Sequence, residues 1–494
     1  MELKKNYLAF DLGASSGRAI LGELSDGRLS LSEIHRFTNG PLEKDGSLFW
    51  DFDAICREIK TGLKKALLKT NDISSIAVDT WGVDYILLKK DGNAARLPYH
   101  YRDARTDKTS EKVFSIVPAA HIYEKTGIQY MQLNTLYQLF EHEKTHPEDF
   151  EGSTLLLIPD ALTYMLCGDR ACEYTEASTS NLIDAKQKNW DLELIERLGL
   201  PSSVFPRIAM PCTAAGKLTP ELQKELSCPA ISVMRIGSHD TASAVASVPA
   251  PHGKKWAYVS CGTWALLGAE LDQPILSEKA RLAGFTNEGG LDGKIRFLTN
   301  IMGTWLLQET KRVWEEKGRK ISYPEMGAMA MKAEPLKFLI NPNDKKFLSP
   351  GDMPGNIRDY CMETGQGKIP DDNAVLRCVY DSLALYFRMK LEELQALLGV
   401  KYECLNIVGG GTKDRTLMQL ASDCLGIAVA AGPVEATSIG NIIGQAMADG
   451  TLSNLADARE IVRSSFDVEE FKPSSGNAVT WNGALEKFRK LCQA

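Results

Sequence analysis

The sequence predicts an α/β protein with two domains, and three observations support this prediction. The 494 residues exceed what one hydrophobic core organises, so more than one domain is expected. Along the first half of the chain, segments with strand-like alternation are interspersed with segments of helical periodicity. A strand, a glycine turn and a second strand also occur near the start of each half, in "AFDLGASSGRAIL" (9–21) and "YVSCGTWALLG" (258–268). Their identity is slight, but their order is the same.

The best linker in the chain is "SVPAPHGKK" (247–255), which contains two prolines and a glycine. The strand and glycine turn that open the second half follow it directly. We therefore predict an N-terminal domain over residues 1–247 and a C-terminal domain over residues 253–494.

The first strand, Tyr7–Phe10, leads into "GASSG" (13–17), which fits the G-x-S-x-G pattern of a serine hydrolase. In such a hydrolase the serine stands on a sharp turn between a strand and a helix. Here Arg18 is followed by "AILGELSDGRLSLSEI", in which Ser25–Gly27 is a turn signal flanked by strand-like residues. The loop should therefore join two strands of a hairpin, which argues against Ser15 as a nucleophile.

The same loop has the composition of a phosphate-binding turn. Its small residues Ala14–Gly17 let backbone N–H groups converge on an anion, and Arg18 could add positive charge. Two such hairpins, one from each half, could hold one polyphosphate. The alternative is an ordinary tight hairpin, because glycine-rich turns are common. The chain contains neither G-x-x-x-x-G-K-[ST] nor a G-x-G-x-x-G that opens a helix.

The spacing of apolar residues and the positions of glycine and proline predict further strands and helices. Residues 75–92, "SIAVDTWGVDYILLKKDG", predict two strands joined by a polar and aromatic turn. Residues 134–148 predict a helix that stops before Pro147, and 155–168, "LLLIPDALTYMLCG", predict a helix that opens through Asp160.

The last third carries a triple glycine. In "LNIVGGGTKDRTLMQLASDCLGIAV" (405–429) a strand ends in Gly409–Gly411 and a helix follows. Three glycines allow a flat base or ribose to approach the backbone closely, and a helix-entry turn is the alternative. Downstream, "EATSIGNIIGQAM" (435–447) predicts a helix of small residues that packs tightly on a neighbour.

Composition excludes several classes. With 44% hydrophobic and 24% charged residues the chain reads as a globular protein, and its net charge of −7 argues against nucleic acid or an anionic membrane as a partner. We find neither a signal peptide nor an apolar run of membrane-spanning length, so we expect a cytoplasmic protein. The 11 cysteines contain no C-x-x-C and the 7 histidines are dispersed, which disfavours a disulfide framework or a zinc site.

Taken together, the motifs resemble the actin/Hsp70/sugar-kinase superfamily and, within it, the FGGY carbohydrate kinases. The resemblance runs nearly end to end, through "DLGASSGR", "DTWGVD", "YRDART", "NTLYQL", "IPD", "EYTEAST", "GSHDTASAV", "CGTWALLG", "TNIMGTWLLQ", "VGGG" and "GPVEATSIGN". It implies an α/β fold of two ribonuclease H-like domains with an active-site cleft between them. "DLGASSGR" and "SHDTASAV" resemble the members that act on L-rhamnulose.

The resemblance also implies site residues, carried over motif by motif. Those implied for ATP are Ala14, Ser15, Ser16, Gly17, Arg18, Thr263, Gln308 and Gly410. Those implied for the sugar are Gly82, His239, Asp240, Thr241 and Asn300, and Asp240 matches the catalytic base. Asp414 stands where the family more often has asparagine. Cys361 and Cys378 keep the spacing of a cysteine pair found in some relatives, and we expect thiols here.

The residues suit the implied chemistry, in which ATP phosphorylates L-rhamnulose at O1 to L-rhamnulose 1-phosphate in L-rhamnose catabolism. Asp240 follows the probable strand "AISVMRIGS" and begins a small-residue helix, where a carboxylate is favoured as an ion and can accept a proton. A helix cap is the alternative role. His239 can donate to a sugar oxygen. Mg²⁺, which ATP needs, would lie near Asp11 and Asp240 and bind mainly through water.

Asp79, Trp81 and Asp84 in "DTWGVD" are further sugar-binding candidates, with core packing as the alternative for Trp81. A second group could bind sugar or form a surface ion-pair cluster: Tyr101, Arg102, Asp103 and Arg105. Other functions remain open at this point. The chain could phosphorylate a related ketose, such as L-fuculose or a pentulose. It could also be an ATP-driven conformational module without a sugar acceptor, although "SHDTASAV" argues against that.

Overall fold

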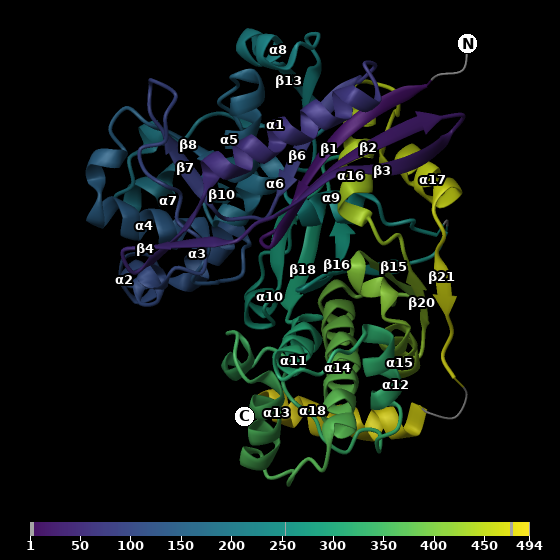
Figure 1. The fold of residues 1–494 in the computed structure, drawn as a ribbon. Coiled ribbons are helices and arrows are strands. Elements are labelled where there is room, and N and C mark those ends of the chain that lie inside the picture. The colour runs from purple at the N-terminus through teal and green to yellow at the C-terminus, as the bar shows by residue number, and fades with distance from the viewer. Residues whose placement is uncertain (1–3, 252, 475–477, 494) are drawn as a thin grey trace. The chain divides into compact units, whose positions relative to one another are not determined.

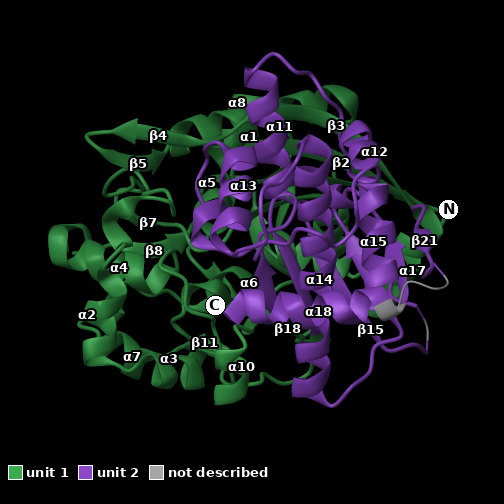
Figure 2. Cartoon of the chain, turned by 90° about the horizontal axis from the view of Figure 1, so that it is seen from below, with its two compact units in different colours: residues 1–247, 270–297, 436–465 green, residues 248–269, 298–435, 466–494 purple. Residues whose placement is uncertain are grey.

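The computed structural model describes residues 4–251, 253–474 and 478–493. By its contacts the chain divides into two compact units (Figure 2). Unit 1 comprises Met1–Ser247, Glu270–Phe297 and Ala436–Ser465, and unit 2 comprises Val248–Ala269, Leu298–Glu435 and Phe466–Ala494. The chain thus leaves unit 1 after Ser247 and re-enters it twice. This division does not test the continuous domains 1–247 and 253–494, which stay a prediction.

Unit 1 is built on a six-stranded sheet with the order β13-β14-β6-β1-β2-β3 (Figure 1). Its strands are β1 (Lys5–Leu12), β2 (Ser16–Ser25), β3 (Arg28–Thr38), β6 (Ser75–Thr80), β13 (Thr213–Lys217) and β14 (Ser232–Arg235). Strand β1 runs antiparallel to β2 and parallel to β6, and β14 runs parallel to β6. The predicted hairpin after the first strand is confirmed, and residues 7–12 are wholly buried, as expected for a strand in the middle of a sheet.

The remaining strands of unit 1 form short pairs, apart from β17 (Thr286–Gly289), which belongs to the larger sheet described below. The pairs are β4 (Pro41–Lys44) with β5 (Ser47–Trp50), β7 (Tyr85–Leu88) with β8 (Thr154–Leu157), β9 (Cys172–Glu173) with β12 (Ile208–Ala209), and β10 (Ile183–Asp184) with β11 (Asn189–Trp190). The predicted strands on both sides of the "DTWGVD" turn are β6 and β7.

The α-helices of unit 1 are α1 (Phe52–Lys69), α2 (Thr109–Ile116), α3 (Ala119–Thr126), α4 (Thr135–Thr145), α5 (Ile158–Cys167), α6 (Tyr174–Ala177), α7 (Leu192–Arg197), α8 (Pro220–Leu226), α9 (Asp240–Ala246), α10 (Glu278–Leu282), α16 (Ala436–Ala448) and α17 (Leu455–Ser465). Helix α4 stops before Pro147, as predicted. Helix α5 begins two residues before Asp160, so the predicted start is wrong. Asp160 lies buried within the first turn, and its Oδ1 accepts the N–H of Glu173.

Unit 2 contains most of a seven-stranded sheet, β17-β18-β16-β15-β19-β20-β21. Its strands are β15 (Trp256–Cys261), β16 (Ala265–Leu271), β18 (Ile295–Ile301), β19 (Cys404–Val408), β20 (Ala428–Ala431) and β21 (Glu469–Phe471). Strand β15 is antiparallel to β16 and parallel to β19, which is parallel to β20. Unit 1 has the same pattern around β1, β2, β6 and β14. The weak repeat seen in the sequence is therefore a repeat of topology.

The α-helices of unit 2 are α11 (Trp305–Glu316), α12 (Tyr323–Ala330), α13 (Met353–Glu363), α14 (Asp372–Leu398), α15 (Arg415–Leu425) and α18 (Ala478–Gln493). Short 3₁₀ turns complete the two units: η1 (Ala104–Thr106), η2 (Pro147–Asp149), η3 (Ser178–Ser180), η4 (Ser202–Val204), η5 (Lys345–Phe347) and η6 (Gly410–Lys413). The 27-residue α14 begins after the capping Asp371 and ends at Gly399 in the left-handed conformation.

Helix α16 packs closely on α9 within unit 1, which confirms the predicted small-residue helix. A Cβ atom added at Gly440 would lie 1.7 Å from the backbone oxygen of Ser243. A Cβ at Gly444 would lie 3.0 Å from the side chain of Ile236. Glycine at 440 therefore sets how near the two helices can approach.

In the part of the chain that the structure describes, no helix is both long and apolar enough to cross a membrane. All 11 cysteines carry free thiols.

Replacing Gly440 with alanine should lower the thermal midpoint of unfolding, because a methyl group at 440 forces α16 and α9 apart. We expect a loss of about 3 kcal/mol, the upper range for overpacking. Gly483, in α18, is the matched control, since no atom lies within 4 Å of its added Cβ. Gly483→Ala should be neutral or stabilise by up to about 1 kcal/mol. Equal midpoints for the two variants would contradict the packing argument.

Candidate functional site

Three carboxylates lie at the carboxyl ends of three neighbouring parallel strands in unit 1. Asp11 is on β1, Asp79 is paired with it in register on β6, and Asp240 follows the loop that leaves β14. An isolated bridge between Thr80 and His239 continues the pairing of β6 toward that loop. In open α/β sheets the carboxyl ends of the strands are where ligands bind. This edge is therefore the candidate site of unit 1.

Asp11 is a buried, paired carboxylate. Its Oδ2 accepts a hydrogen bond from the Arg18 guanidinium at 2.6 Å and another from the Ser438 hydroxyl of α16 at 2.7 Å. Arg18 faces Asp11 across the β1–β2 hairpin. The predicted positive charge of Arg18 is thus present at the loop, and the neighbouring Asp11 balances it.

Asp79 is fully buried, and only one of its two carboxylate oxygens has a hydrogen-bond partner among the described residues. Its Oδ2 accepts a hydrogen bond from Asn441 of α16 at 2.6 Å, while its Oδ1 has no hydrogen-bond partner among the described residues. Burial raises the pKa of Asp79 well above its usual value, and the charges of Asp11 and Asp240 raise it further. The three carboxylates therefore act on one another electrostatically.

Asp240 is the first residue of α9, and His239 occupies the N-cap position before it. Asp240 is therefore not the N-cap residue, and the His239 side chain makes no capping hydrogen bond. The Thr241 hydroxyl donates to Asp240 Oδ1 at 3.0 Å. Burial raises the pKa of Asp240. About a third of the Asp240 side chain is exposed, at 33%, so a substrate can reach it.

Two more predicted sugar residues meet beside Asp240. His239 Nε2 lies 3.5 Å from Asp240 Oδ1, and a Cβ added at Gly82 would lie 3.4 Å from the same nitrogen. It would also lie 3.2 Å from the Thr179 hydroxyl. A side chain at Gly82 would therefore press on Thr179 and His239, so glycine lets the turn lie close to both. Unit 1 brings together Gly82, His239, Asp240 and Thr241.

The predicted phosphate loop is a tight hairpin turn. Gly13 N–H donates to Ser16 O at 2.8 Å, and Asn39 anchors the turn through bonds to Ser15 O and Gly13 O, both at 3.0 Å. Ser15 is exposed at its tip, and a strand rather than a helix follows. The hydrolase interpretation of Ser15 is therefore wrong, because the strand–turn–helix geometry that it needs is missing.

The remaining predicted nucleotide residues lie in unit 2. Thr263, in the β15–β16 turn, donates its hydroxyl to Gln308 Oε1 at 3.2 Å, and Gln308 in turn donates to the Thr304 hydroxyl at 2.9 Å. The triple glycine follows the parallel neighbour β19. A Cβ added at Gly411 would lie 2.3 Å from Cys261 Sγ, whereas one at Gly410 would meet open space.

The other two predicted positions in unit 2 are Asn300 and Asp414. The backbone oxygen of Asn300 accepts a hydrogen bond from Asn343 at 3.0 Å. Asp414 caps α15 by accepting the N–H of Leu417, and it also accepts the Tyr380 hydroxyl at 2.6 Å. The aspartate at this position therefore has a structural role.

Comparisons with known proteins decide the family. The model of the FGGY carbohydrate kinase N-terminal domain matches residues 6–246, and that of the C-terminal domain matches residues 257–448. The chain belongs to the FGGY family of carbohydrate kinases. A rhamnulokinase from Bacteroides thetaiotaomicron is 42% identical over 99% of both chains, and one from Bacillus subtilis is 40% identical over 94% of this chain and 95% of its own.

Solved structures share the fold at low identity. A gluconate kinase from Lactobacillus acidophilus matches with a TM-score of 0.82 at 15% identity, covering 99% of this chain and 98% of that chain. A Plasmodium falciparum glycerol kinase with ADP matches with a TM-score of 0.79 at 15% identity, over 99% of both chains. These structures confirm the predicted fold class, an α/β protein with two ribonuclease H-like domains.

In this FGGY kinase Trp81 and Asp84, the aromatic residue and the second acid of "DTWGVD", have structural roles. Asp84 Oδ2 accepts N–H groups from the indoles of Trp50 and Trp81 at 2.6 and 3.0 Å. The backbone of Tyr101 donates to the same oxygen, and Gln138 donates to Oδ1. The Trp50 and Trp81 rings pack at 4.0 Å. Trp81 and Asp84 are therefore core residues.

The "YRDART" segment is also mainly structural. Asp103 accepts the N–H groups of Leu48 and Arg105. The Arg105 guanidinium lies 3.8 Å from the centre of the Tyr99 ring and donates to Gln138 Oε1 at 2.6 Å. Arg102 lies over the ring of Tyr101. These contacts tie the segment to its neighbours in unit 1.

A buried acid that sequence reasoning missed holds the loop in front of Asp240. Glu173 is fully buried, and its carboxylate accepts the N–H groups of Thr175 at 2.8 Å and Ser238 at 3.1 Å. The Thr175 hydroxyl donates to Glu173 and accepts the N–H of His239 at 3.3 Å. Two consecutive backbone N–H groups of the loop are thus bound. "EYTEAST" matched the family, but only the fold shows that Glu173 reaches this loop.

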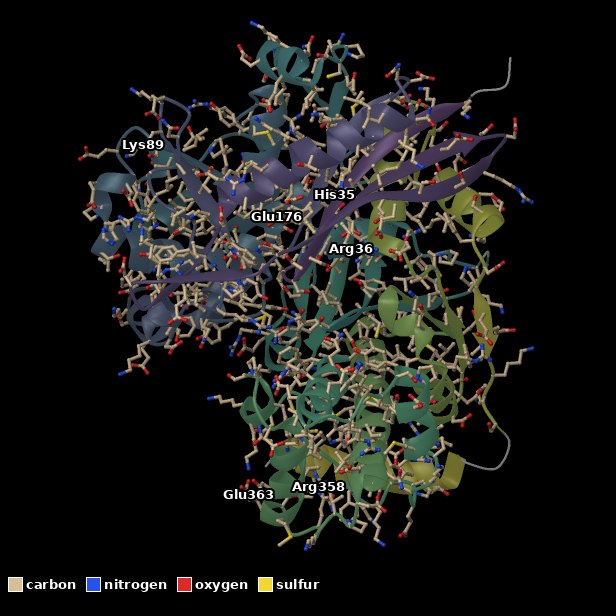
Figure 3. The ribbon with its side chains drawn as sticks, in the orientation of Figure 1. His35, Arg36, Lys89, Glu176, Arg358 and Glu363 are labelled. Atoms are coloured by element: carbon tan, nitrogen blue, oxygen red, sulfur yellow. The ribbon has the colours of Figure 1, made fainter. Side chains whose placement is uncertain are left out.

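Two more carboxyls surround Glu173. Asp160 and Glu176 are buried, and burial raises the pKa of both well above the usual value (Glu176, Figure 3). Neither oxygen of Glu176 has a hydrogen-bond partner among the described residues. In the described part of the chain no group of three His, Cys, Asp or Glu has a geometry that could hold a metal.

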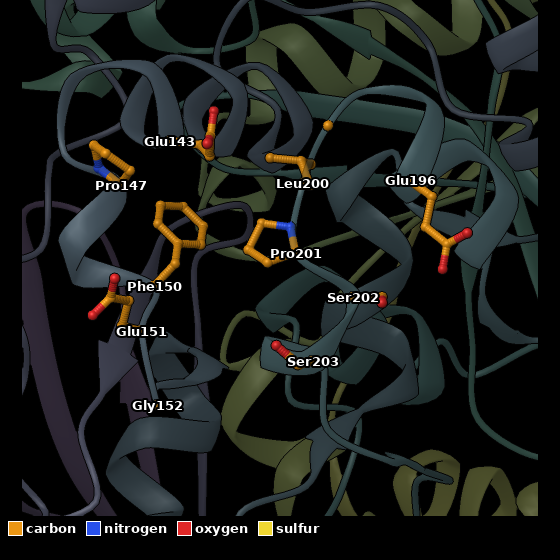
Figure 4. A pocket seen from close by; sticks show the side chains of 11 residues that line it. Glu143, Pro147, Phe150, Glu151, Gly152, Glu196, Leu200, Pro201, Ser202 and Ser203 are labelled. Atoms are coloured by element: carbon orange, nitrogen blue, oxygen red, sulfur yellow. The ribbon is translucent and has the colours of Figure 1, made fainter.

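A surface pocket lies elsewhere in unit 1 (Figure 4). Phe150, Leu200 and Pro201 form its apolar wall, and Glu143, Glu151 and Glu196 line it as well. None of the predicted site residues lines it. We therefore do not assign the reaction to this pocket.

Glu173 should make unfolding depend on pH. Burial raises its pKa from 4.5 to about 7, so between these values the folded protein holds a proton that the unfolded chain has released. Its contribution to stability is complete below pH 4.5 and is lost as the pH rises through 7. The shift corresponds to about 3 kcal/mol.

We expect the thermal midpoint of Glu173→Gln to fall less between pH 5 and 7 than that of the wild type. Asp160 and Glu176, whose pKa values are also raised, leave part of the slope in place. Glu193→Gln at an exposed site of α7 is the control, with an unchanged slope. Identical slopes in all three proteins would contradict this account of Glu173.

Proposed function

We propose that this chain is an ATP-dependent kinase that phosphorylates L-rhamnulose at O1, giving L-rhamnulose 1-phosphate for L-rhamnose catabolism. The observation that carries the proposal is the 42% identity to a rhamnulokinase over 99% of both chains. The partly exposed Asp240, beside His239 and Gly82, supports it, because a sugar hydroxyl needs a proton acceptor of this kind.

In the proposed reaction Asp240 accepts the proton of the O1 hydroxyl. The sugar oxygen forms a bond to the γ-phosphorus while the bond between the γ-phosphorus and the bridging oxygen of ADP breaks. The proposed sugar contacts are Gly82, His239, Asp240, Thr241 and Asn300. His239 suits hydroxyl recognition because its buried ring places Nε2 3.5 Å from Asp240 Oδ1, beside the proposed base.

We propose that two sets of residues bind ATP, one at its phosphates and one at the rest of the nucleotide. The backbone N–H groups of Ala14–Gly17 would bind phosphate oxygens, helped by the hydroxyls of Ser15 and Ser16 and by Arg18. Thr263, Gln308 and Gly410 would contact the nucleotide. The open space over Gly410 and the hydrogen bond from Thr263 to Gln308 support this assignment.

The residues present also fit Mg²⁺. Asp11 and Asp240 supply hard oxygen donors at one sheet edge, where Asp79 Oδ1 is buried without a hydrogen-bond partner in the described chain. No three acids of the described chain are arranged to ligate an ion directly, so water would complete the coordination. We propose that Asp11 and Asp240 hold the ion, mainly through water. When bound, the ion would neutralise phosphate charge.

The acidic net charge of −7 favours small-molecule partners over nucleic acid or an anionic membrane. We therefore propose sugar and ATP as its partners, and we propose the cytoplasm as its location.

Asp240→Asn should lower kcat by at least about 10²-fold, because the amide cannot accept the hydroxyl proton. ATP binding, measured by calorimetry, should stay within a few-fold of the wild type. Asp272→Asn is the matched control, since Asp272 is 84% exposed and paired with Lys294. Full activity of Asp240→Asn would refute the base assignment.

A coupled assay of ATP consumption in the presence of Mg²⁺ identifies the substrate. The acceptors compared are L-rhamnulose, L-fuculose, L-ribulose, L-xylulose, D-xylulose and glycerol. We expect the highest kcat/KM for L-rhamnulose. A clear preference for another ketose would overturn the substrate and keep the class. ATP turnover that no sugar stimulates would instead favour a conformational ATPase.

A further inference from the structure

Arg296, at the start of β18, is a charged side chain that is fully buried in unit 1. Its Nε donates to the backbone oxygen of Gly289 at 2.7 Å, and its terminal nitrogen Nη2 contacts His239 Nδ1 at 3.1 Å. The same nitrogen forms an ion pair with Glu288 Oε2 at 3.1 Å. Burying a guanidinium carries a large desolvation penalty, so its partners must be well placed. The proposed reaction does not use Arg296 or Glu288.

The contact from Arg296 favours one tautomer of the neutral His239 ring. A guanidinium has only donors, so Nδ1 must accept and carries no hydrogen. A neutral ring then carries its hydrogen on Nε2, the nitrogen that lies beside Asp240 and Gly82.

Glu288 presents the competing arrangement. Its Oε2 lies 3.3 Å from the same Nδ1 and would favour a hydrogen there. One nitrogen cannot accept from Arg296 and donate to Glu288 at once. The contact with Arg296 meets hydrogen-bond geometry, whereas the approach of Glu288 Oε2 to Nδ1 does not. Glu288 therefore acts as the counter-charge of Arg296.

We infer that Arg296 and Glu288 are positioning residues for the sugar site, which fix His239 with its hydrogen on Nε2 so that it donates to a hydroxyl of the sugar. The inference rests on the proposed function for the identity of the ligand. The backbone of His239 is fixed separately, through Thr175 and Glu173. Ring and backbone are thus held by different residues.

The double variant Glu288→Gln with Arg296→Met tests the pair without leaving one buried charge alone. We expect the KM for the sugar to rise about tenfold, the cost of one lost hydrogen bond, while the KM for ATP changes less than about twofold. A merely structural pair would lower the thermal midpoint and leave the ratio of the two KM values unchanged.

The chain offers a matched control in Glu270 and Arg459, another ion pair of unit 1, at 2.8 Å, with side chains 8% and 11% exposed. Arg459 also donates to the backbone oxygens of Val245 and Ala246. Glu270→Gln with Arg459→Met should lower the midpoint without raising the KM for the sugar. A sugar KM raised equally in both double variants would overturn the inference.

A second readout needs no turnover and no variant of the pair. In protein labelled with ¹⁵N-histidine, ring correlations report which nitrogen bears hydrogen, and His239→Gln assigns the signal. We expect the Nε2–H form for His239 in the wild type. A hydrogen on Nδ1 would overturn the inference even where the double variant fails to fold. A kinase inactive on every ketose would refute the proposed function and leave this readout intact.

Discussion

The parallel pairing of β1, β6 and β14 is the constraint on which the candidate site depends. Parallel strands end at the same edge of a sheet, so residues that follow these strands must meet there. Asp11 and Asp79 are partners in register, although they are 68 positions apart, and the β14 loop brings Asp240 to the same edge. No local preference of these segments could assemble the three carboxylates.

Gathering buried acids in one place is unfavourable, and the surrounding elements compensate for it. Helix α16 contributes Ser438 to Asp11 and Asn441 to Asp79, from positions three apart on one helix face. This reach depends on the close approach of α16 to α9 at Gly440. Glu173 in turn binds the loop in front of Asp240. The charged edge and the tight helix packing therefore depend on each other.

The two units share a strand topology, but their loops carry different groups. In each, an antiparallel hairpin with a short glycine-containing turn lies beside a parallel strand that ends in a loop. In unit 1 the loops carry the carboxylates and His239. In unit 2 they carry Thr263 and the triple glycine, where Gly409 and Gly411 leave room only for Cys261. The same scaffold thus presents charged groups in one unit and open backbone in the other.

The sequence alone determined the local features and the family. The β1–β2 hairpin, the stop of α4 before Pro147 and the small-residue helix α16 each follow from a few adjacent residues, and the motifs implied the fold. Only the tertiary structure decided which candidates lie together and which are held in structural contacts. It placed Asp84 among four N–H donors in the core, made Asp414 a helix cap, and brought Asp79, Glu173 and Arg296 to the residues around Asp240. Hydrogen bonds between residues far apart in the chain depend on strand register and helix packing, and neither is encoded within a short motif.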